Sequence, residues 1–174
     1  MPLDRAGNLL GALSLAVADR TSDALGDAAG HETAAAALTA LHEFLDDPSV
    51  DLLRRVLGLT PSGTVRLIDR LESAGHVKRQ PGRDARSVGV HLTPSGRRAA
   101  ERVAAARAQV LQDALEGLGP DERRALEGLA GRMLVGMMRG PGAVRWMCRL
   151  CDMTACGRPE GRCPVANAAR ERYA

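Results

Sequence analysis

The four cysteines of this 174-residue chain gather near its C-terminus as Cys148, Cys151, Cys156 and Cys163. Their spacing is C-x2-C-x4-C-x6-C. A C-x2-C pair can hold one ion from a tight turn, and two further thiolates complete a tetrahedron. Four thiolates suit Zn²⁺, which we prefer slightly, and they equally suit an iron–sulfur cluster, whose ligands often include a Cys-Pro step. The sequence therefore predicts a metal centre, either structural or sensory.

Two alternative interpretations of these four cysteines are open. A reversible disulfide switch would use the same clustering, and unconnected free thiols are the third alternative. Stable disulfides are disfavoured in a reducing cytosol, so the close grouping favours the metal centre. Cys163 precedes the expected start of a short terminal helix, and a helix N-terminus stabilises a thiolate.

Basic residues concentrate in the middle of the chain, although the net charge is only +3. Residues 54–98 hold ten basic and three acidic side chains, whereas residues 1–53 hold two basic and nine acidic ones. Such a concentration of positive charge is typical of a surface that binds a polyanion. A solvated basic face is the plainer interpretation, and the pattern within the segment decides between them.

A helix start signal stands inside the basic segment. Thr60 offers a capping hydroxyl, and Pro61 occupies the first helical position, where its missing N–H costs nothing. We expect the helix that follows to bury Val65, Ile68 and Leu71 and to end near Gly75. The side chains expected outward or sideways are Ser62, Gly63, Thr64, Arg66, Asp69 and Arg70.

The periodicity then changes from 3.6 to 2, which predicts a β-hairpin over residues 77–92 with a basic tip at 81–86. Helix, turn, helix and two-stranded ribbon is the order of a winged helix-turn-helix. Short polar side chains let the N-terminal end of its second helix enter the major groove, where arginine contacts bases or phosphates. We expect Arg83 and Arg86 to reach the minor groove and Asp84 to brace a neighbouring arginine. The predicted DNA-binding residues are Thr60, Ser62, Gly63, Thr64, Arg66, Arg70, Arg83, Asp84 and Arg86.

Three stretches carry a resemblance to a known family. They are LTPSGTVRLIDRLESAGHV at 59–77, RDARS at 83–87 and LTPSG at 92–96. Together they resemble the MarR family of bacterial regulators, over about residues 3–140. The resemblance implies a homodimer joined by its first and last two long helices and bound to a pseudo-palindromic DNA operator. It also implies a repressor that a ligand or oxidation releases.

The fold class we predict is mainly α with a small β-hairpin wing, flanked by dimerisation helices. The expected helices cover residues 4–27, 32–46, a short stretch after Ser49, 61–74, 94–118 and 120–139. The expected domains are an N-terminal dimerisation helix at 1–30, a winged helix-turn-helix at 31–93, C-terminal dimerisation helices at 94–140, and a cysteine-rich appendage at 141–174.

The chain departs from the family in two respects. Phe44, Trp146 and Tyr173 are its only aromatic residues, so an aromatic-lined pocket for a small-molecule ligand is not indicated. Residues 1–147 contain no cysteine, so the oxidation-sensing site of some members is missing. We expect Trp146 to pack on the dimerisation helices, and Met133, Met137 and Met138 to serve packing.

Other function classes receive less support. No apolar run approaches the ~20 residues of a membrane span, and the N-terminus lacks signal-peptide features, which predicts a cytoplasmic protein. No Ser/His/Asp set, phosphate loop or paired carboxylates are present, so we do not expect an enzyme. The alternatives are a redox- or metal-active protein and a protein–protein adaptor that reuse the winged-helix scaffold.

Overall fold

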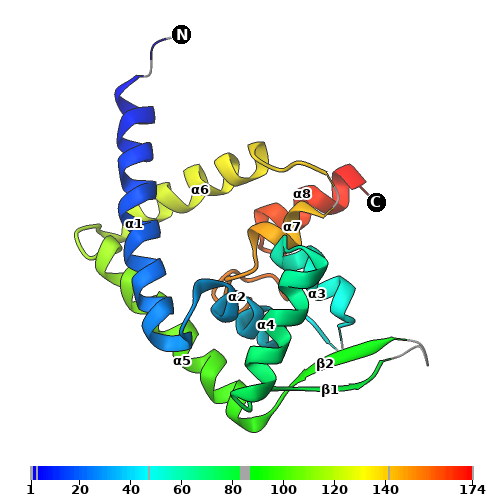
Figure 1. Cartoon of the computed structure of the whole chain (residues 1–174). Helices are drawn as coiled ribbons and strands as arrows, with labels where there is room; N and C mark the ends of the chain where they lie inside the picture. The colour runs from blue at the N-terminus through cyan, green and yellow to red at the C-terminus, as the bar shows by residue number, and fades with distance from the viewer. Residues whose placement is uncertain (1, 3, 47, 83–86, 141, 174) are drawn as a thin grey trace.

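A computed structural model describes residues 2, 4–46, 48–82, 87–140 and 142–173 (Figure 1). It confirms a mainly helical fold with one antiparallel two-stranded hairpin. The elements are α1 (Arg5–Ala29), α2 (Glu32–Glu43), α3 (Val50–Leu57), α4 (Pro61–Ser73), β1 (Val77–Pro81), β2 (Val88–Leu92), α5 (Pro94–Leu115), α6 (Pro120–Gly136), α7 (Ala143–Met147) and α8 (Pro164–Tyr173).

Side-chain hydroxyls cap the N-terminal ends of α3, α4 and α5, and the cap at Thr60 confirms the prediction from the sequence. The hydroxyl of Ser49 accepts a hydrogen bond from the backbone N–H of Leu52 at the start of α3, at 3.2 Å. Thr60 and Thr93 do the same for α4 and α5, each accepting from the residue three positions on. These hydroxyls satisfy backbone donors that the first helical turn leaves without partners.

Three helices end about three residues earlier than expected. Helix α2 ends at Glu43 instead of near residue 46, α5 at Leu115 instead of near residue 118, and α6 at Gly136 instead of near residue 139. Phe44 leaves the helical region at φ −152°, so α2 stops before the Asp-Pro sequence at 47–48. Helix ends depend on such local backbone choices, which composition does not specify closely.

Helix α2 is the centre of the main core. Every residue from Ala34 to Leu41 is buried, because α1, α3, α4, α5 and β2 all pack against this helix. Alanine is the dominant residue type there, and its small side chain lets the surrounding helices approach closely. The larger side chains of the core come from the neighbouring elements, among them Leu25, Leu53, Ile68 and Val103.

The hairpin of β1 and β2 extends outward from the main core (Figure 1). Val77 pairs with Leu92 at its base and Pro81 with Val88 toward its tip. The N–H of Val90 donates to the carbonyl of Pro48 at 3.0 Å, which fixes β2 to the segment before α3. The wing is therefore held by the same chain segment that starts the helix-turn-helix.

A second, smaller core lies in the C-terminal part of the chain. It consists of Met138, Val144, Cys148, Cys163 and Val165, with half-buried neighbours from α7 and α8. In the described part of the chain, no helix is both long and apolar enough to cross a membrane.

We predict that Gly96→Ala destabilises the fold. A Cβ at Gly96 would stand 1.9 Å from the carbonyl oxygen of His76, so α5 could not approach the start of the hairpin. Forcing extra atoms into a packed site costs about 1–3 kcal/mol of unfolding free energy. Urea unfolding at fixed protein concentration measures the change. Gly26→Ala is the matched control, because its Cβ meets nothing within 4 Å; equal losses in the two variants would contradict the prediction.

Candidate functional site

Helix α4 packs one face into the main core. The buried residues are Thr64, Leu67, Ile68 and Leu71, which follow the i, i+3, i+4, i+7 pattern of one helix face. Val65 is 47% exposed, so the expectation that it lies in the core is wrong. Leu67 is buried in the core in place of Val65.

Thr64 also corrects the sequence prediction. The sequence predicts Thr64 as a DNA-binding residue, but its side chain is completely buried. Its hydroxyl donates to the carbonyl of Thr60 at 2.9 Å, and this internal hydrogen bond satisfies the buried polar group. Thr64 therefore supports the start of α4 from inside and has no surface with which to contact a ligand.

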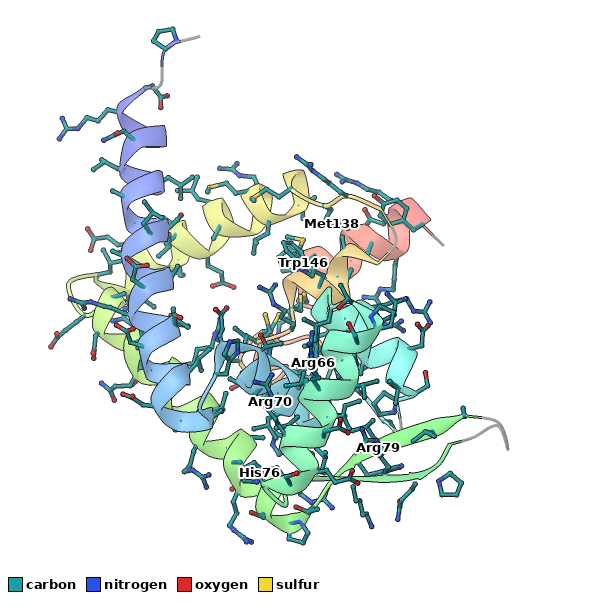
Figure 2. The ribbon with its side chains drawn as sticks, in the orientation of Figure 1. Arg66, Arg70, His76, Arg79, Met138 and Trp146 are labelled. Atoms are coloured by element: carbon teal, nitrogen blue, oxygen red, sulfur yellow. The ribbon has the colours of Figure 1, made fainter. Side chains whose placement is uncertain are left out.

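The opposite face of α4 is open to solvent. Thr60, Ser62, Arg66 and Arg70 are exposed, and Gly63 is half-buried. Figure 2 shows Arg66 and Arg70 at successive turns along this helix. Neither arginine forms an ion pair with another described residue, whereas Asp51 pairs with both Arg54 and Arg55 nearby. The guanidinium groups of Arg66 and Arg70 thus leave their donors available to an anionic ligand.

Gly63 lies where a larger residue would disturb the cap. Its N–H donates to Thr60 Oγ1 at 3.1 Å, and a Cβ at this position would come to 3.0 Å from the same oxygen. Ser62 Oγ lies 3.4 Å from Thr60 Oγ1. Three of the predicted site residues therefore form one compact polar end of the helix.

Arg79 on β1 fixes the hairpin to α4, a role that the sequence prediction missed. Its guanidinium pairs with both Asp69 and Glu72, and its backbone N–H donates to Glu72 Oε1 at 3.1 Å. Hydrogen bonding to Asp69 is the main reason that the pKa of Arg79 is raised. The sequence signal for this contact was the presence of two acidic residues near the end of α4 and a basic residue on the strand that follows. Figure 2 shows Arg79 at the hairpin, beside α4.

Three predicted wing residues lie outside the described residues. These are Arg83, Asp84 and Arg86, and their assignment as minor-groove contacts stays a prediction.

All four cysteines lie in or against the second core. All four are free thiols; Cys148 and Cys163 are buried, and Cys151 and Cys156 are half-buried. The N–H of Cys151 donates to the carbonyl of Cys148 at 3.0 Å, which closes the tight turn expected of a C-x2-C pair. The N–H of Ala166 donates to Cys163 Sγ at 3.4 Å, so this sulfur caps α8 as its position predicted.

The thiols stand in two pairs. Hydrogen bonding with Cys148 lowers the pKa of Cys151 to about 7, and the same contact raises the pKa of Cys148. Burial raises the pKa of Cys156 to about 12, and hydrogen bonding with Cys163 adds to the effect. Across the described ranges, no three or more His, Cys, Asp or Glu side chains converge closely enough to hold a metal ion as they stand.

Trp146 does not pack on the long helices as expected. It is 52% exposed, and its indole lies against Gly58 at the end of α3, where a Cβ would come to 3.7 Å from Nε1. Arg149 covers the ring at 5.0 Å from its centroid. Of the three methionines expected to serve packing, Met138 is buried, while Met133 and Met137 are exposed in the single chain.

Comparison with known proteins finds one matching family model. Residues 31–87 match the model described as MarR family, a range that runs from α2 through α3, α4 and β1 to the wing. None of the curated proteins compared matches the chain in sequence.

Solved structures share the fold beyond that range. A MarR family protein from Bacillus stearothermophilus is 27% identical, covers 76% of this chain and 92% of its own, and has a TM-score of 0.67. Wild-type MarR from E. coli in its apo form is 26% identical, covers 72% of this chain and 96% of its own, with a TM-score of 0.59. A probable transcriptional regulator from Pseudomonas aeruginosa is 26% identical, with 75% and 97% covered and a TM-score of 0.55.

We predict that Thr60→Ala destabilises the chain by about 1 kcal/mol, because the first turn of α4 loses its capping oxygen. Thr60→Ser keeps a hydroxyl at this position and should retain most of the stability. Urea unfolding of both variants at one protein concentration provides the measurement. Equal unfolding free energies for the alanine and serine variants would show that the cap is not the cause.

Proposed function

We propose that this chain is a sequence-specific DNA-binding transcriptional regulator, because residues 31–87 match the model described as MarR family. Members of this family are transcription regulators rather than enzymes. The observation that carries the proposal is the exposed face of α4, where Arg66 and Arg70 stand without acidic partners among the described residues. The same helix buries its other face in the core, so the arginines are held outward.

The physical basis is the fit of such a helix end to the major groove. Thr60 and Ser62 are short polar residues at the N-terminal end of α4, and they leave room for close approach to base edges. Arg66 and Arg70 supply planar donor groups that bind two acceptors of a guanine or one phosphate. The ion pairs of Arg79 with Asp69 and Glu72 fix the hairpin beside α4, so the helix and the wing keep one relative position. We propose that Arg83 and Arg86 at the wing reach the adjacent minor groove.

We propose that the chain acts as a homodimer. MarR-family regulators are dimeric, and this chain leaves apolar residues of its terminal helices uncovered. Leu9 of α1 is 57% exposed, and α6 exposes Leu129 and Leu134. A second copy would remove these side chains from water, which favours association. In Figure 1 the N-terminal part of α1 extends beyond the body of the chain.

Two further features follow from a twofold dimer. A pair of α4 helices related by symmetry reads two half-sites in opposite orientation, so the operator is pseudo-palindromic. We propose that the bound dimer represses transcription by occupying that operator, as the family resemblance implies. Salt dependence separates this function from the two alternatives, since neither a metal-active protein nor a protein–protein adaptor needs to release counterions from a duplex.

We predict that binding to a duplex selected from a random-sequence library weakens steeply with salt. Arg70→Ala should flatten the plot of log affinity against log salt by about 0.9 for a lost phosphate contact. Arg66→Ala should also reduce discrimination between the selected duplex and a scrambled one. Fluorescence anisotropy between low and moderate salt measures both. Arg102→Ala, an exposed arginine on α5, is the matched control; the same flattening there would contradict the assignment to α4.

We predict that Leu9→Glu weakens the dimer, because it places a charge in the apolar surface that the second copy covers. Analytical ultracentrifugation should show a higher proportion of monomer, and affinity for the selected duplex should fall with it. Val88→Glu is the control for the sedimentation result alone: this residue is 45% exposed, and the hairpin on which it lies is away from α1 and α6 in Figure 1. A dimer that Leu9→Glu leaves unchanged would exclude this face of α1.

A further inference from the structure

The cysteine segment connects two functional parts of the chain. Its N-terminal half contacts the helix-turn-helix, and its C-terminal half continues into a helix that lies along α6. Each half contains one of the two cysteine pairs. Figure 1 shows α7 and α8 between α3 and α6.

The first pair, Cys148 and Cys151, is anchored to the helix-turn-helix. Just before it, Trp146 lies against Gly58 in the turn between α3 and α4. Between the two cysteines, Leu150 packs against the main core. Just after it, the N–H of Met153 donates to Glu43 Oε2 at the end of α2, at 2.8 Å and partly buried.

The second pair, Cys156 and Cys163, is anchored to α6. Cys163 begins α8, and Pro164 lies over Gly131 of α6, where a Cβ would come to 3.2 Å from Pro164 Cγ. Arg172 near the other end of α8 donates to the carbonyl of Val135 at 3.3 Å. The contact therefore extends along both helices.

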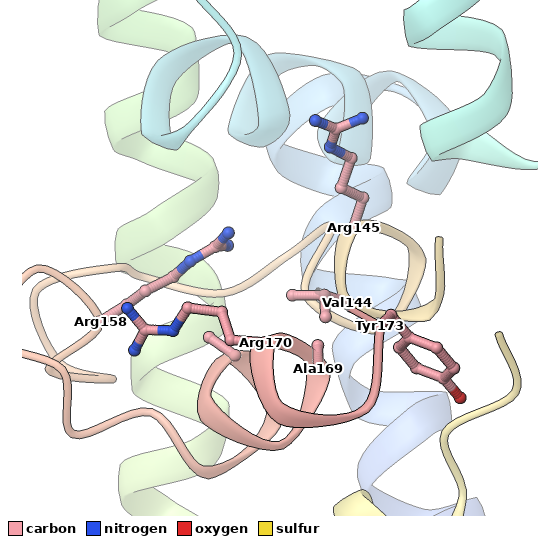
Figure 3. Close-up of a pocket in the computed structure, with 7 residues that line it drawn as sticks. Val144, Arg145, Arg158, Ala169, Arg170 and Tyr173 are labelled. Carbon is pink, nitrogen blue, oxygen red and sulfur yellow. The ribbon is translucent and has the colours of Figure 1, made fainter. Parts of the chain in front are cut away.

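The segment between these anchors consists of turns, with no helix or strand from residue 149 to 163. The second core around it is small, and two of its five buried members are Cys148 and Cys163. Small cores of this kind are commonly completed by a metal or by cross-links. Arg158 and Arg170 line a pocket of about 460 Å³ beside this segment, on the same side of it in Figure 3. Of these two arginines, Arg158 interacts electrostatically with the thiols, and its positive charge is of the sign that offsets the negative charge of four thiolates.

We propose that the four cysteines bind one thiophilic metal centre, and that this centre couples α6 to the helix-turn-helix. As the thiols stand, all four are free and lie in or against the second core, and no three of them converge closely enough among the described residues to hold a metal ion. A metal centre displaces the thiol protons and draws the two pairs onto a common group. Because one pair is anchored to α2 and α3 and the other to α6, binding changes or fixes the position of the DNA-binding helices relative to the dimerisation helix. The coupling to DNA rests on the proposed function; the metal centre itself does not.

The first test measures metal in the full chain purified without oxygen. We expect about one centre per chain, lost in both Cys151→Ser and Cys156→Ser, which each remove one member of a pair. Zinc with no colour identifies a zinc ion, and iron with inorganic sulfide and a brown colour identifies a cluster. After chelation, Zn²⁺ alone or Fe²⁺ with sulfide should restore the centre accordingly. A metal-free protein with four titratable thiols that neither addition loads would overturn the proposal.

The second test measures affinity for the selected duplex with and without the centre. We expect removal of the metal to change the affinity by about tenfold or more, within the range of typical coupling between sites. Trp146→Ala should retain the metal but reduce this difference, because the contact with Gly58 is lost. Tyr173→Phe, which removes only a hydroxyl that accepts from the N–H of Gly140, is the control. Equal affinity of the loaded and stripped protein would overturn the coupling, whereas a loaded protein that ignores DNA would refute the proposed function instead.

Discussion

The face of α4 that packs into the core determines which side chains the helix can present to a ligand. Thr64, Leu67, Ile68 and Leu71 are held inside, and a helix has little freedom to rotate once four such positions are buried. Arg66 and Arg70 are outward as a consequence. The cap at Thr60 and the Arg79 brace act on the same helix from its two ends, so its position relative to the wing is set by packing, a hydrogen bond and ion pairs together.

The proposed dimer and the cysteine segment matter because they would place this helix in space. A single recognition helix contacts a few base pairs, and a twofold pair of such helices at a fixed separation recognises an operator. Helices α1 and α6 expose apolar surface that the proposed pairing would cover. The cysteine segment connects α6 with α3 through its contacts at Pro164 and Trp146, so in the proposed dimer a small change there would alter the separation of the two α4 helices.

Much of this arrangement could be predicted from local sequence signals. Thr60-Pro61 and Thr93-Pro94 mark helix starts because the capping hydroxyl and the proline act within one turn, and both caps form. The buried face of α4 was harder, because a threonine occupies one of its four core positions. Its hydroxyl bonds to a carbonyl of its own helix, and this lets a polar residue replace a hydrophobic one without loss. The position of Trp146 depends on residues almost ninety positions away in the sequence, and no local pattern carries that information.

The central claim is that two copies of α4, related by twofold symmetry, enter successive major grooves on one side of a duplex. Hydroxyl-radical footprinting of the full chain on a selected duplex tests it directly. The account predicts two equivalent protected regions, with their centres about 10 base pairs apart or a small multiple of that spacing, and related by the symmetry of the site. One protected region, or uniform protection without a centre of symmetry, would contradict it.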